Sequence, residues 1–131
     1  MRKNKVILIG LDGCCFRILQ PLIENGYLPT FSEILRAGSY GTLISTLPFN
    51  TLPAWTSIFT GVNPGKHGIT GTLIRENNAY RVANSNYRMV DSLWMILSRS
   101  NIEQIIINDP VTYPPEKIKG IMFTGFSTPP R

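Results

Sequence analysis

The sequence contains few of the residues that build disulfide scaffolds or zinc sites. It has one histidine, His67, and two cysteines, Cys14 and Cys15, which are neighbours. Adjacent cysteines rarely meet disulfide geometry, so a disulfide framework is excluded. A zinc site built from cysteine and histidine would lack enough ligands. We expect free thiols in a reducing compartment and therefore a cytoplasmic protein.

Charge is also sparse. Only 16% of the 131 residues are charged, with a net charge of +5, and no basic run is interleaved with aromatic residues. This predicts no specific nucleic-acid partner, whereas a small anionic substrate would suit the charge. No apolar run approaches the ~18 residues of a membrane span, so we expect no membrane association.

Apolar runs of two kinds alternate along the chain. Short β-branched runs predict strands, and apolar residues three and four apart predict helices. Strands are expected at 5–11, 39–47, 103–108 and 120–125, and helices at 16–26, 29–38, 53–60 and 90–100. The alternation favours an α/β domain with a mainly parallel central sheet. Residues 1–131 are interpreted as a single domain whose last strand ends without a stop, as though truncated.

A polar segment and a glycine-rich loop interrupt this pattern. Residues 72–86 are polar around Glu76-Asn77-Asn78 and indicate a hairpin or a surface excursion. Residues 61–71 are rich in Gly, Pro and Asn and are expected to be a loop. Within this loop, Gly61 to Lys66 fails the spacing of a P-loop, and no Gly-x-Gly-x-x-Gly follows the first expected strand. Both common nucleotide-binding loops are therefore excluded.

Asp12 comes directly after the first expected strand. The carboxyl ends of parallel strands collect functional groups, so this carboxylate could bind a metal or act as a base. It could equally start a turn with Gly13 or cap the following helix. Taken alone, the residue leaves both interpretations open.

Thr51 stands at the start of the helix expected at 53–60. Threonine is a good N-cap, and a helix N-terminus also offers free N–H groups to a phosphoryl group. As a nucleophile its hydroxyl would need a base or a metal ion. His67, in the loop that follows, is interpreted as a hydrogen-bonded organiser of that loop and not as a ligand.

Several motifs in order resemble the type I phosphodiesterase/nucleotide pyrophosphatase family of the alkaline phosphatase superfamily. The resemblance covers essentially the whole chain, and its most specific parts surround Thr51 and His67. The motifs are Leu11-Asp12-Gly13, Leu28-Pro29-Thr30-Phe31, Thr51-Leu52-Pro53-Ala54-Trp55-Thr56-Ser57, Thr60-Gly61-Val62-Asn63-Pro64-Gly65-Lys66-His67-Gly68-Ile69, Asn108-Asp109-Pro110-Val111-Thr112-Tyr113-Pro114-Pro115 and Gly125-Phe126-Ser127-Thr128-Pro129-Pro130.

The resemblance implies an alkaline-phosphatase-like three-layer sandwich and a site with two divalent metal ions, usually zinc. Asp12 would be a metal ligand, and Thr51 would be both nucleophile and metal ligand in the hydrolysis of phosphodiesters or nucleotide pyrophosphates. Thr72 stands about where an asparagine of the family helps to hold the phosphoryl group, which makes it a substrate-binding candidate. The family's other metal ligands are Asp and His residues further along its chains, so we expect this chain alone to have little activity.

Other functions stay open. A sulfatase would need Cys or Ser in Cys/Ser-x-Pro-x-Arg, and a phosphoglycerate-mutase-like isomerase would present Ser, so both fit less well. A non-catalytic alternative is a truncated domain that self-associates through an open sheet edge, because unpaired edge strands invite pairing.

Overall fold

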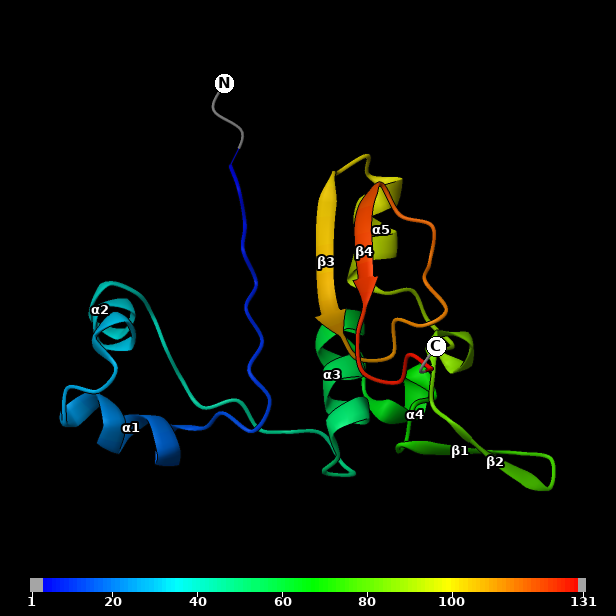
Figure 1. The fold of residues 1–131 in the computed structure, drawn as a ribbon, viewed down its shortest axis with the longest axis horizontal. Helices are drawn as coiled ribbons and strands as arrows, with labels where there is room; N and C mark the ends of the chain where they lie inside the picture. The colour runs from blue at the N-terminus through cyan, green and yellow to red at the C-terminus, as the bar shows by residue number, and fades with distance from the viewer. Residues whose placement is uncertain (1–3, 130–131) are drawn as a thin grey trace. The chain divides into compact units, whose positions relative to one another are not determined.

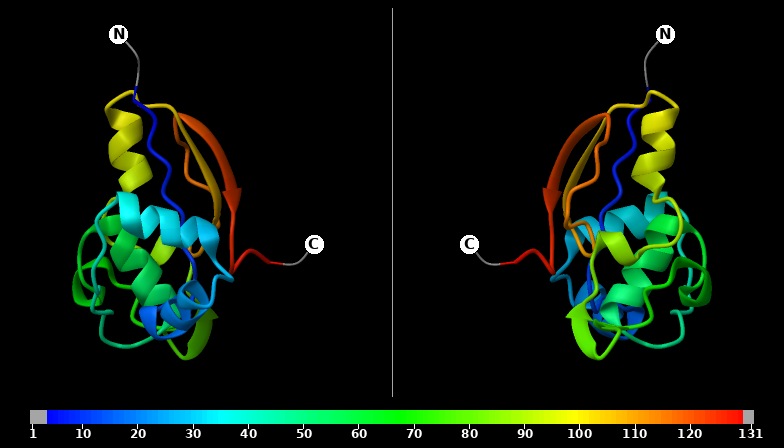
Figure 2. Two further views of the ribbon diagram at one scale, coloured as in Figure 1. Left: turned by 90° about the vertical axis from the view of Figure 1, so that its left-hand side faces the viewer. Right: turned by 90° about the vertical axis from the view of Figure 1, so that its right-hand side faces the viewer.

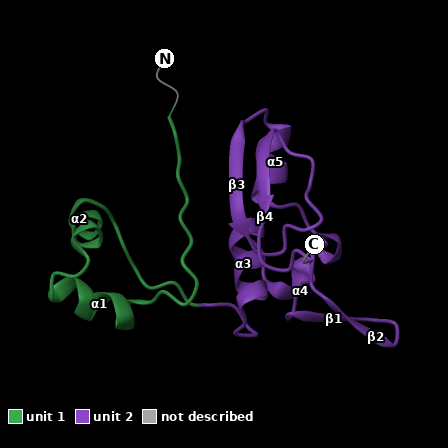
Figure 3. Cartoon of the chain, in the orientation of Figure 1, with its two compact units in different colours: residues 1–44 green, residues 45–131 purple. Residues whose placement is uncertain are grey.

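The computed structural model describes residues 4–129, which fall into two compact units, residues 1–44 and 45–131. Figure 3 shows the units in separate colours. The expectation of a single domain stays a prediction.

The first unit is a pair of helices, α1 (Phe16–Glu24) and α2 (Pro29–Ala37), that contact each other. Both were expected from their apolar spacing. The ring of Phe16 lies 5.6 Å from that of Tyr40, between centroids. The strands expected at 5–11 and 39–47 do not form: residues 4–11 and 39–46 make no ladder, and the apolar side chains of 6–9 are exposed.

The second unit contains the remaining elements, which Figure 1 labels. In chain order they are α3 (Thr51–Thr60), α4 (Pro64–His67), β1 (Leu73–Glu76), β2 (Ala79–Val82), the 3-10 helix η1 (Ser85–Tyr87), α5 (Leu93–Arg99), β3 (Gln104–Asp109) and β4 (Gly120–Thr124). The short helix α4 lies inside the segment expected to be a loop.

Two separate two-stranded sheets occur in this unit. Strands β1 and β2 pair antiparallel around Asn77, whose φ of 55° closes the expected hairpin. Strands β3 and β4 pair in parallel, with Ile105 opposite Ile121. Helix α5 contacts β3. Figure 2 shows α5, in yellow, to one side of the strand pair. The chain is thus a mixed α/β protein with small sheets, and the mainly parallel central sheet stays a prediction.

A small apolar core holds the second unit together. Leu52 of α3, Ile69 after α4, Ala83 after β2 and Val111 after β3 form a cluster in which each side chain is at most 1% exposed. These side chains come from segments far apart in sequence. The core therefore fixes the start of α3 against the loop after α4 and against the segment after β3.

Of the two ends of helix α3, only the C-terminal end lies where the sequence predicted it. Gly61 ends the helix in the left-handed conformation, with φ 70°, as a glycine there predicts. The helix begins at Thr51, two residues before the expected start at Pro53. Thr51 is therefore the first helical residue and not the N-cap.

Candidate active site

Asn50, and not Thr51, caps the start of α3. Its backbone is extended, with φ −150° and ψ 147°, and its side-chain Oδ1 accepts the N–H of Leu52 at 3.3 Å. Of the interpretations that the sequence left open for Thr51, that of an N-cap is wrong, because an equally good capping residue precedes it. The exposed Thr51 hydroxyl is thereby released from a capping role.

The N-terminus of α3 offers fewer N–H groups than a helix start normally does. Leu52 donates to Asn50, Pro53 has no N–H, and Ala54 donates to the carbonyl of Asn50 at 3.1 Å. Of the first four positions, only Thr51 keeps an N–H for which the described part of the chain shows no acceptor. A phosphoryl group on Thr51 would therefore meet one free N–H group at this helix start, and not several.

Thr72 lies beside this cap. Its Oγ1 donates to Oδ1 of Asn50 at 3.3 Å, across 22 residues of sequence. Its carbonyl accepts the N–H of Ala83 at 2.8 Å, which ties it to the hairpin. The structure thus brings Thr72 to the residue that precedes Thr51. Its hydroxyl proton is engaged with Asn50, and the hydroxyl oxygen can still accept.

His67 is fully buried and makes hydrogen bonds with both ring nitrogens. Nδ1 accepts the N–H of Ile69 at 3.1 Å, so Nε2 carries the proton of the neutral ring and donates to Oγ of Ser57 at 2.9 Å. Burial lowers the pKa of His67 most, the nearby charge of Arg88 adds to this, and backbone hydrogen bonds oppose it. The interpretation of His67 as a hydrogen-bonded loop organiser agrees with this geometry.

Asp12 lies in the first unit. It forms a turn with Gly13, whose φ is +68°, directly before α1, and its side chain is exposed. Thr51 and Thr72 both belong to the second unit. Within the second unit, the structure therefore brings together two of the three predicted site residues, Thr51 and Thr72, through Asn50.

Asp109 is a carboxylate at the end of β3 that sequence reasoning gave no role. Burial raises its pKa to about 6. Its backbone carbonyl accepts the hydroxyl of Thr112 at 2.6 Å. It pairs with Thr124 at the carboxyl end of the parallel pair, after an irregularity between Ile107 and Asp109. A carboxylate that charges near neutral pH thus lies at the strand ends.

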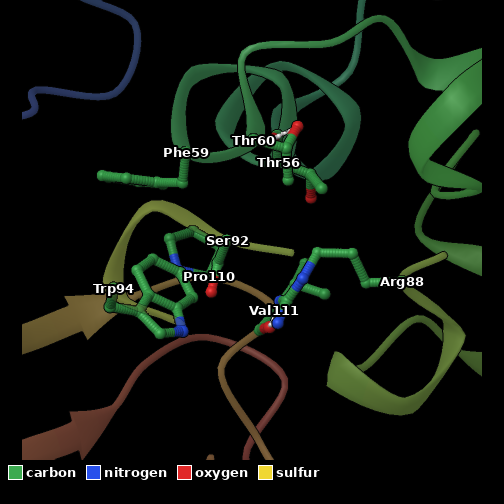
Figure 4. A pocket seen from close by; sticks show the side chains of 8 residues that line it. All are labelled: Thr56, Phe59, Thr60, Arg88, Ser92, Trp94, Pro110 and Val111. Atoms are coloured by element: carbon green, nitrogen blue, oxygen red, sulfur yellow. Dashed lines mark hydrogen bonds between the residues drawn. The ribbon is translucent and has the colours of Figure 1, made fainter. Parts of the chain in front are cut away.

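A hollow in the second unit lies between α3 and the segments around α5 and after β3. Figure 4 shows Thr56 and Phe59 on one side and Ser92, Trp94 and Arg88 on the other. Glu116 binds the guanidinium of Arg88 and accepts the indole N–H of Trp94 at 2.6 Å. The hollow has no room for a water-sized sphere, so it is a packing gap and not a substrate site.

Comparison with protein families gives one decisive match. The model of the type I phosphodiesterase/nucleotide pyrophosphatase family matches residues 6–124, which is most of the chain. The chain belongs to this family. The match spans Asp12, Thr51 and Thr72, as the resemblance of the motifs predicted. Comparison with curated proteins and with solved structures gives no significant match.

Family membership makes the hydrolysis of phosphodiester or pyrophosphate bonds the class of reaction. Catalysts of this class in the superfamily use divalent metal ions, and a two-metal site needs several ligands. Within residues 4–129 no three His, Cys, Asp or Glu side chains gather in one place, and both nitrogens of His67 are engaged. The described residues thus show no cluster of donors of the size that two metal ions need.

No helix in residues 4–129 is long and apolar enough to cross a membrane. The expected cytoplasmic location stays a prediction.

Sequence reasoning missed two residues of the site, Asn50 and Ser57. Asn50 gave a usable signal, because asparagine directly before a helical threonine is a strong capping candidate. Ser57 gave none, since its pairing with His67 joins residues ten apart through the path of the intervening loop.

Proposed function

We propose that this chain carries the nucleophile of a phosphodiesterase or nucleotide pyrophosphatase, and that the nucleophile is Thr51. The observation that carries the proposal is the exposed Thr51 hydroxyl at the first position of α3, which the neighbouring cap Asn50 leaves free, in a chain of this family. Small phosphate esters are the substrate class.

The proposed reaction proceeds in two displacements. The Thr51 oxygen attacks phosphorus, the bond from phosphorus to the leaving oxygen breaks, and the Thr51 proton is lost to a base. Water then attacks phosphorus, the bond from phosphorus to the Thr51 oxygen breaks, the phosphate product leaves with the water oxygen, and a proton from the water restores the Thr51 hydroxyl. The free N–H of Thr51 is the helix donor that remains for a phosphoryl oxygen, and Thr72 is proposed to contact substrate through its oxygen or through Asn50.

Asp12 and Thr51 are proposed as the metal ligands that this chain contributes, with two divalent ions, zinc by resemblance, in a complete site. Both are oxygen donors, which divalent ions accept. Two donors do not hold two ions. We therefore propose that the chain by itself turns over little or no substrate.

The test is hydrolysis of bis(4-nitrophenyl) phosphate with added Zn²⁺ or Mn²⁺, together with peptide mass spectrometry for phosphothreonine. We expect turnover close to that of the metal ions alone, and any phosphoryl label to lie on Thr51. Thr51→Val should lose the label, and Thr51→Ser should retain it. Label on another residue would overturn the assignment of Thr51. Thr51-dependent turnover of about 1 s⁻¹ or more would overturn the proposed inertness.

A second candidate is self-association through the β3–β4 sheet. Four apolar side chains form one exposed face of the parallel pair, with exposed fractions from 53% to 67%: Ile105, Ile107, Ile121 and Phe123. They lie opposite each other in register, and they alternate with the less exposed side chains of these strands. A second copy of the chain offers the same apolar face and the same unpaired strand edges.

This face alone would give a weak dimer. Four such side chains expose at most roughly 500 Å², short of the ~800 Å² per partner of a standard interface. Light scattering after size exclusion should therefore show mass that rises with concentration. The double variant Ile107→Lys, Phe123→Lys should stay monomeric, whereas Leu73→Lys, an exposed apolar position on β1, should not change the mass. A concentration-independent monomer would exclude the candidate.

A further inference from the structure

We propose that His67 is a positioning residue for Thr51, and that it acts through the loop after α4. The proposal rests on the proposed function, because it assigns His67 the task of placing the nucleophile. The imidazole bonds Ser57 of α3 on one side and Ile69 of the loop on the other.

The first step is the fixed proton on the ring. A backbone N–H can only donate, so the bond from Ile69 makes Nδ1 an acceptor and places the proton on Nε2. Nε2 then donates to Ser57 in the second turn of α3. A protonated ring would lose the acceptor at Nδ1, and a ring with the proton on Nδ1 would clash with the Ile69 N–H. One tautomer therefore serves both contacts.

The second step runs from the loop to the start of α3. The bond at Nδ1 closes the turn at Gly68, which is left-handed with φ 82°, and directs Ile69 into the core. There Ile69 clusters with Leu52, the residue after Thr51. Three residues after Ile69 the chain reaches Thr72, whose hydroxyl donates to the cap Asn50.

Asn50 completes the connection. Its Oδ1 receives both the Thr72 hydroxyl and the Leu52 N–H, at 3.3 Å each. The backbone on either side of Thr51 is thus held by contacts that depend on the path of residues 68–72. The carbonyl of His67 accepts the N–H of Met89 at 3.1 Å, and this bond needs no side chain at position 67. It offers an internal reference for whether the loop is folded.

The groups that face the ring are the Ser57 hydroxyl of α3, the Pro53 carbonyl of the same helix, the Ile69 N–H of the loop and the charge of Arg88 from the segment after η1. Among residues 4–129, no carboxylate is recorded against the ring. The site favours the neutral ring, which is the form with an acceptor at Nδ1.

The test is amide hydrogen exchange by NMR on the whole chain. His67→Gln can reach Ser57 but offers no acceptor to Ile69, and His67→Asn places an amide oxygen near the position of Nδ1. We expect the Ile69 and Leu52 amides to exchange about five- to tenfold faster in His67→Gln, which is the loss of one hydrogen bond. His67→Asn should restore most of the protection. Met89 and the amides of β3 and β4 should stay unchanged and so report an intact fold.

The unaltered chain gives a second measurement that does not depend on a variant folding. The ¹⁵N shifts of the ring should show the Nε2–H tautomer at pH 7. An Nδ1–H ring would overturn the proposal. Faster exchange at Ile69 with unchanged exchange at Leu52 would also overturn it, because the loop would then not hold the helix start. Neither readout involves phosphate chemistry, so failure of Thr51 as the nucleophile would leave them unaffected.

Discussion

Asp109→Asn should stabilise the chain above neutral pH. Burial raises the pKa of Asp109 from 3.8 to about 6, and the described residues give its carboxylate no hydrogen bond or ion pair. The folded state thus holds the proton more tightly than the unfolded state. Its stabilising contribution is complete below pH 3.8 and is lost as pH rises through about 6. Asparagine has the shape of the neutral acid and no proton to lose.

The magnitude follows from the two pKa values. The rise from 3.8 to about 6 corresponds to about 3 kcal/mol, at about 1.4 kcal/mol per pKa unit. Asp109 keeps part of its surface in water, so we expect a gain of about 1–2 kcal/mol at pH 8. At pH 4.5 the unfolded chain has lost most of its Asp109 proton and the folded chain has not. Linkage then leaves about a third of that gain.

The assay is urea unfolding at pH 8 and pH 4.5, followed by tryptophan fluorescence. Asp91→Asn is the matched control, because Asp91 is exposed and its hydrogen bond with Arg99 lowers its pKa, so that its change should not stabilise the chain at pH 8. The reasoning is refuted if Asp109→Asn destabilises at pH 8, or if its gain is the same at both pH values.

Three further predictions concern the second unit. Glu116→Gln leaves the Arg88 guanidinium, whose side chain is 4% exposed, without its counter-charge, and should cost about 2–3 kcal/mol in urea unfolding. Gly61→Ala should cost about 1–2 kcal/mol, because its φ is +70°, whereas Gly65→Ala in α4 should be close to neutral; thermal unfolding compares the two. For His67, whose pKa is lowered, the unfolded chain gains the proton first, so stability should be full above pH 6.5 and fall as pH falls below it; an NMR titration with a pKa at or above 6.5 would contradict this.

Local pattern predicted much of the fold. Helices α1 and α2 and strands β3 and β4 appear within about two residues of their expected bounds, because apolar spacing and flanking Gly or Pro determine such elements locally. The strands expected at 5–11 and 39–47 are missing from the described structure, since a strand exists only with a partner and sequence pattern cannot supply one. The three-layer sandwich stays a prediction.

The site was predictable to the extent that family motifs carry it. Thr51 and Thr72 were predicted in this way and stay predictions, and the structure adds that Asn50, directly before Thr51, bonds Thr72. The two bonds of His67 were not predictable, because they depend on where a loop returns and on which ring nitrogen holds the proton. Asp109 was overlooked because burial, and not residue type, gives it its unusual pKa.

The cap at Asn50 separates two demands that often fall on one residue. Because α3 is closed by its preceding neighbour, the side chain at position 51 has no part in forming the helix. Replacing Thr51 with Ser, Cys or Ala therefore removes no capping hydrogen bond, so the stability of the fold should change little. During evolution, reactivity could thus be lost, regained or redirected at position 51 while the fold stays intact. Substitution of Asn50, in contrast, would remove the helix cap and destabilise the fold.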